Sequence, residues 1–117
     1  MQAVEQKVDA IGVDNVQVNW VRRRTIAEFA LQHRLPTISA WHQFVEAGCL
    51  MAYEANPEDQ GRRIAAYVDK ILKGARPADL PVNRATVFDL TVNTTTAKAL
   101  GLVITPALQL LITRTIE

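Results

Sequence analysis

The chain has 117 residues, of which 49% are hydrophobic and 21% are charged. This composition is typical of a globular protein and excludes wholesale disorder, and the length suits a single compact unit with its own core. Thirteen Lys and Arg stand against twelve Asp and Glu, which gives a net charge of +1. Charges of both signs are interleaved, which argues against nucleic acid as a partner. No apolar run approaches the roughly 20 residues that a membrane-spanning helix needs.

Cysteine and histidine are too few for the usual disulfide or metal chemistry. Cys49 is the only cysteine, which excludes an intramolecular disulfide and a cysteine-rich zinc site, and its apolar neighbours predict a buried structural thiol. His33 and His42 lack the spacing of metal ligands, so we expect neither a metal nor another cofactor. Residues 1–9 show no basic region followed by an apolar one, so no secretory signal is predicted.

Short apolar runs alternate with amphipathic stretches in the first half of the chain. Residues 10–13, 36–40 and 50–53 are apolar or β-branched, and we expect them to form buried strands. A first helix is expected over residues 20–34, with apolar side chains on one face and arginines on the other. A second, short helix is expected over residues 41–47, closed by the glycine that follows it.

The strongest helical pattern covers residues 57–73. Asn56 is the expected N-cap, Pro57 suits the first helical position, and Gly74 is the expected residue after the last turn. One apolar stripe recurs at helical spacing: Ile64, Val68, Ile71 and Leu72. The sequence therefore predicts an amphipathic helix whose stripe faces the core.

The last third of the chain combines a stiff connector with one clear strand. Residues 75–83 contain two prolines and cannot form a regular helix or a central strand, so we expect an extended connector. Residues 86–92 alternate in polarity, which is typical of a strand. A short helix is expected over residues 95–100, and Thr105 with Pro106 opens a final short helix.

This order of strands and helices predicts an α/β sandwich with a mostly parallel sheet. Ligands bind such sheets beyond the carboxyl ends of the strands. The candidate ligand-binding residues therefore stand at the expected strand ends: Asn15, Trp41, Tyr53 and Glu54. Tyr53 is the leading candidate. Trp20 and Trp41 follow two strand ends, where their rings either stack on a ligand or pack in the core.

No catalytic residue is expected. Ser39 and His42 are near each other in the sequence, but a Ser–His pair needs an orienting third group to activate a nucleophile. The chain has neither a G-x-S-x-G nucleophile elbow nor a glycine-rich phosphate loop. We therefore expect that the protein is not an enzyme.

Several segments, spread in order along nearly the whole chain, carry a resemblance to a known family. The longest covers residues 67–82. The others cover residues 33–36, 44–48, 50–53, 88–93 and 96–102. Together they resemble the ABC-transporter substrate-binding proteins of the tryptophan/tyrosine-uptake type.

That resemblance implies the type I periplasmic-binding-protein fold, in which two flavodoxin-like, three-layer lobes are joined by three crossover segments. Such proteins hold a small solute, often an amino acid, between the lobes and deliver it to a membrane permease from the periplasm. This chain is similar to the C-terminal lobe only. Residues 1–75 are expected to be an incomplete second lobe, and residues 76–117 a crossover and C-terminal segment packed on a partner chain. As written, without a signal peptide, the chain is expected to stay in the cytoplasm.

The chain departs from the family pattern at the expected binding site. Glu54 stands where the family has a glycine after the tyrosine of the third strand, and Cys49 stands where it has a glycine before a Leu-Met pair. A glycine lets the backbone approach a ligand closely, so the bulky acid is expected to weaken the pocket. Residues 108–112 are apolar, whereas the C-terminal end of the family is polar.

The functional expectation is a truncated, solute-binding-protein-like domain with weak or no ligand binding alone, because one lobe buries only part of a ligand. The alternative is a degenerate fragment that acts only as a self-associating structural or interaction protein. We expect a homodimer through residues 86–117, since Phe88, Leu90 and Val92 would otherwise lie in water. The other outcome is that this tail folds back on its own lobe.

Overall fold

The structure is a computed structural model that describes residues 7–117, and the chain divides into two compact units. The larger, called the sheet unit, combines the residues up to Glu54 with Asp89–Glu117. The smaller, called the α5 unit, is Ala55–Phe88. This division differs from the expected boundary after residue 75, because the C-terminal residues complete the sheet that the N-terminal residues begin.

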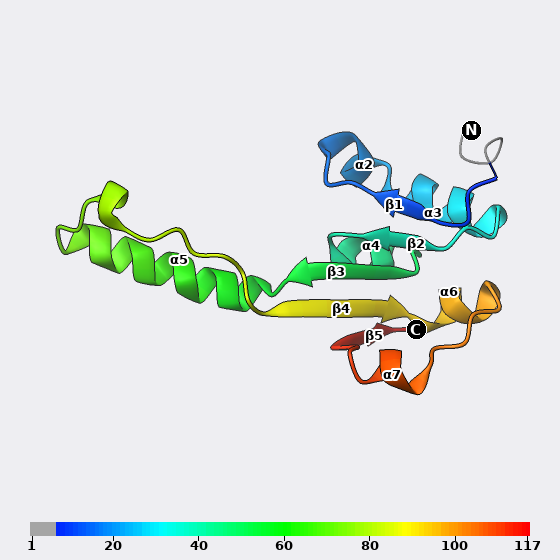
Figure 1. The fold of residues 1–117 in the computed structure, drawn as a ribbon. Coiled ribbons are helices and arrows are strands. Elements are labelled where there is room, and N and C mark those ends of the chain that lie inside the picture. The colour runs from blue at the N-terminus through cyan, green and yellow to red at the C-terminus, as the bar shows by residue number, and fades with distance from the viewer. Residues whose placement is uncertain (1–6) are drawn as a thin grey trace. The chain divides into compact units, whose positions relative to one another are not determined.

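Five strands form one sheet in the order β1-β2-β3-β4-β5, which is also their order along the chain (Figure 1). Their bounds are β1 Ile11–Val13, β2 Thr37–Ser39, β3 Met51–Ala55, β4 Phe88–Asn93 and β5 Arg114–Ile116. β1, β2 and β3 are parallel to one another, as are β4 and β5. β4 runs opposite to β3 (Figure 1), and Asn93 N donates to Leu50 O at 2.9 Å. The expected α/β fold with a mostly parallel sheet is confirmed.

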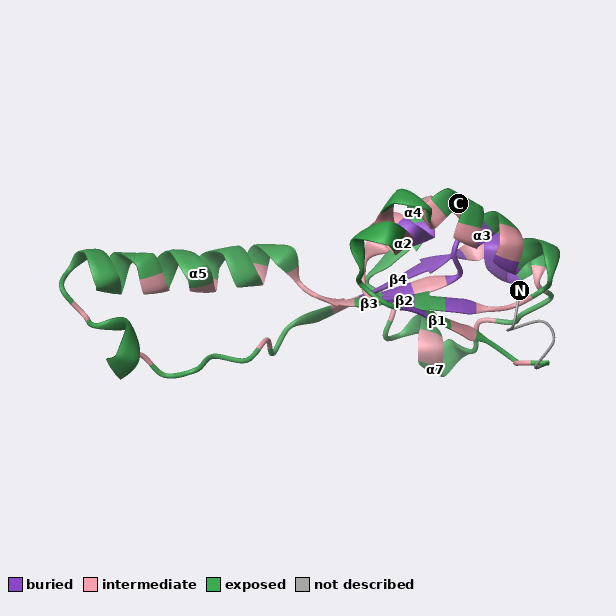
Figure 2. Ribbon diagram, turned by 90° about the horizontal axis from the view of Figure 1, so that it is seen from above, coloured by how far each residue is buried: buried purple, intermediate pink, exposed green. Residues whose placement is uncertain are grey.

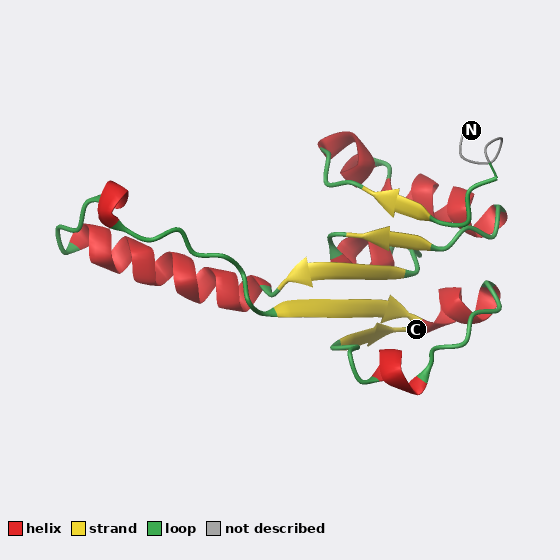
Figure 3. Ribbon diagram, viewed as in Figure 1, coloured by secondary structure: helices red, strands yellow, loops and turns green. Residues whose placement is uncertain are grey.

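Short helices cover the sheet on both sides. α2 (Gln17–Val21), α3 (Arg23–Gln32) and α4 (His42–Glu46) lie on one side, and α7 (Pro106–Gln109) lies on the other (Figure 2). α6 (Thr94–Ala99) directly follows β4 (Figure 3).

The helix expected over residues 20–34 begins earlier and is divided. Arg22 has φ of −95° and ψ of 12°, which separates α2 from α3. After α3, Arg34 takes a positive φ of 54°, in the left-handed region where the chain leaves a helix. Gly48 takes φ of 114° after α4, which a residue with a side chain rarely adopts, and this fits the glycine expected there.

The core of the sheet unit lies between the sheet and the helices. Its central cluster is Val13, Ala27, Phe44 and Cys49. Burial of Cys49 confirms the predicted structural thiol. That burial raises the pKa of the Cys49 thiol above its ordinary value of 9.0, and a hydrogen bond with the Thr37 side chain opposes the rise.

The tail folds back on its own unit. Leu90 and Val92 are only 9% and 1% exposed, so the expectation that they lie in water is wrong. The reason is that β4 pairs on both sides, with β3 and with β5, a strand that the sequence did not predict. Six large apolar side chains of residues 86–117 remain exposed: Val87, Phe88, Leu102, Val103, Leu110 and Leu111.

The α5 unit consists of α5 (Pro57–Leu72) and the connector that returns beside it (Figure 1). Asn56 caps α5 as predicted, with its side chain accepting from a first-turn N–H at 2.8 Å. A 3-10 turn at Pro77–Asp79 interrupts the extended connector. Arg63 ties the connector to the helix by donating to Asn83 Oδ1 at 2.9 Å.

The apolar stripe of α5 is exposed, which corrects the prediction that it faces the core. α5 contains no buried residue. The exposed fractions are 63% for Ile64, 49% for Val68, 42% for Ile71 and 82% for Leu72. The periodicity identified an amphipathic helix, but in this unit Ile64, Val68 and Ile71 line only an open groove between α5 and the connector, which leaves them largely exposed. A charge placed at Val68 would therefore meet water and not a core. None of the helices in the described residues is both long and apolar enough to cross a membrane.

Candidate ligand-binding edge of the sheet

The carboxyl ends of β1, β2 and β3 point the same way and define one edge of the sheet, called the ligand edge (Figure 1). In α/β sheets this is the edge where ligands bind, because the loops that follow the strands gather there. Asn15 follows β1, Trp41 follows β2, and β3 ends with Tyr53 and Glu54 among its last residues. The structure thus brings all four candidate residues to or beside this edge.

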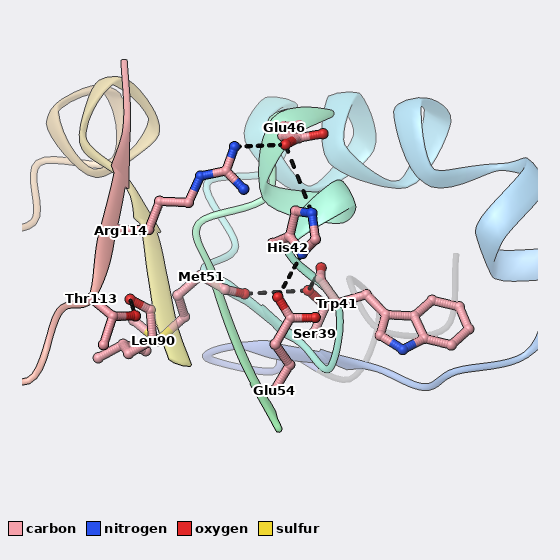
Figure 4. Close-up of polar contacts among 9 residues, drawn as sticks. All are labelled: Ser39, Trp41, His42, Glu46, Met51, Glu54, Leu90, Thr113 and Arg114. Atoms are coloured by element: carbon pink, nitrogen blue, oxygen red, sulfur yellow. Dashed lines mark hydrogen bonds and ion pairs between the residues drawn. The ribbon is translucent and has the colours of Figure 1, made fainter. Parts of the chain in front are cut away.

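Glu54 is nearly buried and paired with a histidine (Figure 4). Its side chain is 9% exposed, and its Oε1 lies 2.6 Å from Nδ1 of His42, whose side chain is 23% exposed. Because a carboxylate only accepts, Nδ1 carries the hydrogen of this contact. His42 is the first residue of α4, so the pair ties the end of β3 to the start of α4.

Glu46 extends this polar network to β5 (Figure 4). Its Oε1 lies 4.0 Å from Nε2 of His42 and 3.0 Å from Nη2 of Arg114. Glu46 and Arg114 are about half exposed, at 46% and 51%, so solvent weakens their attraction. α4 is therefore joined to β3 by a shielded pair and to β5 by an exposed one.

Trp41 belongs to an aromatic cluster. Its ring meets that of Trp20 edge-on, with the ring centroids 5.3 Å apart, and its centroid lies 6.5 Å from that of Phe44. The guanidinium carbon of Arg23 lies 4.8 Å from the ring centroid of Trp20. Both tryptophan rings therefore pack against other aromatic rings, which was one of the two alternatives that the sequence left open.

Asn15 and Tyr53 are exposed. The backbone N–H of Asn15 donates to Asp14 Oδ1 at 2.7 Å, and Asn19 Nδ2 donates to Asp14 O at 3.0 Å, so the loop after β1 is closed by its own polar groups. Tyr53 is 53% exposed. As the strand neighbour of Glu54, it faces the opposite side of the sheet. A ligand-binding role for the four candidates stays a prediction.

His42 is the residue that sequence reasoning did not connect with this edge. The sequence suggested only Ser39 as its partner. In the structure the Ser39 hydroxyl donates to the carbonyl oxygens of Trp41 at 3.1 Å and Met51 at 3.4 Å, while His42 pairs with Glu54. That pairing depends on β2 and β3 lying side by side in parallel, which no local spacing reveals.

Two grooves in the described part of the chain have none of the four candidates in their lining. One of about 500 Å³ lies in the sheet unit, beside Gly12 of β1 and Phe29 of α3. The other, of about 560 Å³, lies in the α5 unit between α5 and the connector. The described residues contain no group of three or more His, Cys, Asp or Glu placed to hold a metal ion.

Comparison with known proteins identifies the architecture. The family model of the ABC transporter substrate binding proteins matches residues 1–115. A conserved domain protein from Vibrio cholerae superposes with a TM-score of 0.83 at 30% identity, over 98% of this chain and 39% of that one. An ABC domain from Streptococcus pneumoniae in complex with L-Trp superposes with a TM-score of 0.82 at 26% identity, over 97% of this chain and 40% of that one.

A third solved structure is the ligand-free, open form of a substrate binding protein with adhesive properties from Clostridium difficile. It superposes with a TM-score of 0.75 at 26% identity, over 99% of this chain and 41% of that one. The chain therefore spans about two-fifths of the length of these structures. Among curated proteins, none matches the chain.

Proposed function

The chain belongs to the ABC transporter substrate-binding protein family, and on that premise we propose that it contributes the C-terminal lobe of a protein that binds a small solute of the amino-acid class. The observation that carries this proposal is the family match over residues 1–115, supported by 97% coverage of the chain on a structure that holds L-Trp. The proposal includes delivery of the solute to a membrane permease and a location outside the cytoplasm, and it assigns no enzymatic activity.

The chemistry of the ligand edge supports an amino acid as the solute. An amino acid carries an ammonium group, and the Glu54 carboxylate is an acceptor that favours an ammonium over a carboxylate at this point. Since Oε1 of Glu54 already contacts His42 at 2.6 Å, a bound ammonium competes with the imidazole or uses the second carboxylate oxygen. Asn15, exposed in the loop after β1, offers an amide that both donates and accepts.

The chain alone is expected to bind weakly. Good pockets bury about 70–90% of a ligand, whereas a single lobe covers one side of it. The chain spans about 40% of its solved relatives, so contacts from the opposite side of the ligand are missing from these residues.

A titration of the isotope-labelled chain with L-Trp, L-Tyr and other amino acids, followed by amide NMR shifts, tests the proposal. We expect shifts confined to Asn15, Trp41, His42 and Glu54, with half-saturation above about 1 mM. Half-saturation in the micromolar range contradicts the one-lobe argument. Shifts that are absent, or that lie only in the α5 unit, contradict the assignment of the ligand edge.

A second candidate function is a self-associating structural protein, and the exposed stripe of α5 favours it. In the surface expected from the sequence, residues 86–117, Leu90 and Val92 are buried in their own sheet, whereas Leu102, Val103, Leu110 and Leu111 remain exposed. α5, with no buried residue, is the better candidate for a contact with a second copy.

A further inference from the structure

The carboxylate of Glu54, which we propose as the acceptor for the ammonium group of a solute, already has a partner. Its Oε1 lies 2.6 Å from Nδ1 of His42. The Glu54 side chain is 9% exposed, whereas the His42 side chain is 23% exposed. The imidazole is therefore the more accessible member of the pair and covers part of the carboxylate, so a solute that is to contact Glu54 fully has to displace it.

A second acceptor for the imidazole lies one turn further along α4. Figure 4 shows the His42 ring between two carboxylates, with contacts to Glu54 and to Glu46. Nε2 of His42 is 4.0 Å from Oε1 of Glu46, which is longer than a hydrogen bond. Residues four apart on a helix are neighbours, so a rotation of the His42 side chain can bring its ring to Glu46. Arg114 contacts the same oxygen of Glu46 at 3.0 Å from β5.

We propose that His42 is a specificity-determining residue of the ligand edge. Its imidazole occupies the Glu54 carboxylate until a solute binds, and only a solute that carries an ammonium group displaces it. An imidazole donates one N–H to the carboxylate in this contact, whereas an ammonium brings three N–H groups and a compact positive charge. This inference rests on the proposed function, and it decides that the ammonium competes with the imidazole and does not merely use the second carboxylate oxygen.

Competition and positioning predict opposite effects when the imidazole is removed. A residue that only positions Glu54 would weaken solute binding when it is lost. A competitor instead lowers the fraction of copies whose carboxylate is free, and the apparent affinity falls by that fraction. A hydrogen bond to a charged group leaves the carboxylate free in roughly one copy in ten or fewer. Removal of the imidazole should therefore strengthen the binding of an ammonium solute about tenfold.

Amide NMR titrations of three variants with L-Trp test this direction. His42→Ala removes the competitor, and we expect half-saturation at an about tenfold lower concentration than for the unchanged chain. His42→Asn restores an N–H donor near the position of Nδ1 and should remove most of that gain. His33→Ala is the matched control, because His33 is exposed and contacts the ring of Phe29, outside this network.

N-acetyl-L-Trp, which has no ammonium group, is the matched ligand control. It should bind no more tightly to His42→Ala than to the unchanged chain. An equal gain for both ligands overturns the proposal, because it indicates a general opening of the site. Unchanged or weaker binding of L-Trp by His42→Ala also overturns it, since His42 would then act as a positioning residue or not at all.

A thermal-shift measurement separates this inference from the proposed function, because its probe is not an amino acid. His42→Ala leaves the Glu54 carboxylate without its donor, and methylammonium supplies one. About 100 mM methylammonium chloride should raise the Tm of His42→Ala by at least about 3 °C more than tetramethylammonium chloride, which has no N–H. The unchanged chain and the double variant His42→Ala with Glu54→Gln should differ by under about 1 °C between the two salts.

The outcomes of the thermal-shift measurement are distinct. Equal shifts in all three chains overturn the inference. A shift confined to His42→Ala, without L-Trp binding by any variant, supports competition at Glu54 and contradicts the proposed function. If His42→Ala is unfolded without additive, we expect refolding by methylammonium and not by tetramethylammonium, and failure of that rescue overturns the inference.

Discussion

Removal of the His42 side chain is expected to destabilise the sheet unit, because it leaves the shielded carboxylate of Glu54 without its hydrogen-bond partner. The Glu54 side chain is only 9% exposed, and His42 Nδ1 at 2.6 Å is the partner that the structure gives it. A hydrogen bond to a charged group contributes about 1.5–3 kcal/mol, and an unsatisfied buried partner costs a similar amount. We therefore expect His42→Ala to lower the free energy of unfolding by about 2–3 kcal/mol.

A neighbouring pair in the same network provides the internal comparison. Glu46 and Arg114 are 3.0 Å apart but 46% and 51% exposed. Exposed ion pairs contribute about 0–1 kcal/mol, because water already stabilises both charges. The structure therefore predicts a coupling energy for His42 with Glu54 that clearly exceeds the coupling energy for Glu46 with Arg114.

Two double-mutant cycles measured by urea denaturation give both coupling energies. Each cycle uses alanine at one position, at the other and at both. The reasoning predicts about 1.5–3 kcal/mol for the first cycle and below about 1 kcal/mol for the second. Equal coupling energies, or a larger one for Glu46 with Arg114, would falsify the burial argument.

Other predictions concern the core, the thiol and the ligand edge. Phe44→Ala should lower the free energy of unfolding by about 3–5 kcal/mol, because Phe44 is 0% exposed. Val68→Ala should lower it by under about 0.5 kcal/mol, because Val68 is exposed. Equal losses in urea denaturation would contradict the exposure of the apolar stripe of α5. Burial raises the pKa of Cys49, so its contribution to stability is fully present below 9.0 and is lost as the pH rises through the higher folded value. A pH-independent difference in unfolding free energy between the unchanged chain and Cys49→Ala above pH 9.0 contradicts this. Glu54→Gly should raise the amino-acid concentration at half-saturation in the NMR titration at least several-fold, because a bound ammonium loses its carboxylate acceptor. An unchanged value removes Glu54 from the site.

Local sequence patterns were sufficient to predict features in which a residue contacts its near neighbours along the chain. Asn56 and Thr105 cap α5 and α7 by accepting from N–H groups three residues on, at 2.8 Å and 3.3 Å. Asn93 caps α6 in the same way, at 2.8 Å. The polarity alternation of residues 86–92 likewise located β4. These features depend on a few consecutive residues, so they can be predicted from the sequence alone.

Features that depend on distant partners were missed. β5 is three residues long and is a strand because β4 lies beside it. The apolar stripe of α5 repeats at helical spacing, but periodicity does not reveal what covers it, and the structure leaves it exposed. At the ligand edge, the strand pattern predicted that Glu54 lies near the end of its strand. Its contact with His42, twelve residues away in sequence, depends on the parallel pairing of β2 and β3.

The most direct test of the lobe assignment is a chimera. The matching 40% of the Streptococcus pneumoniae protein found with L-Trp is replaced by this chain, and amino-acid binding is measured by calorimetry, with the unaltered pneumococcal protein as control. If the chain is a working C-terminal lobe, the chimera should bind an amino acid with one-to-one stoichiometry, at least about 100-fold more tightly than the isolated chain. A chimera that folds cooperatively but binds no amino acid, with either Glu54 or glycine at that position, contradicts the proposed function.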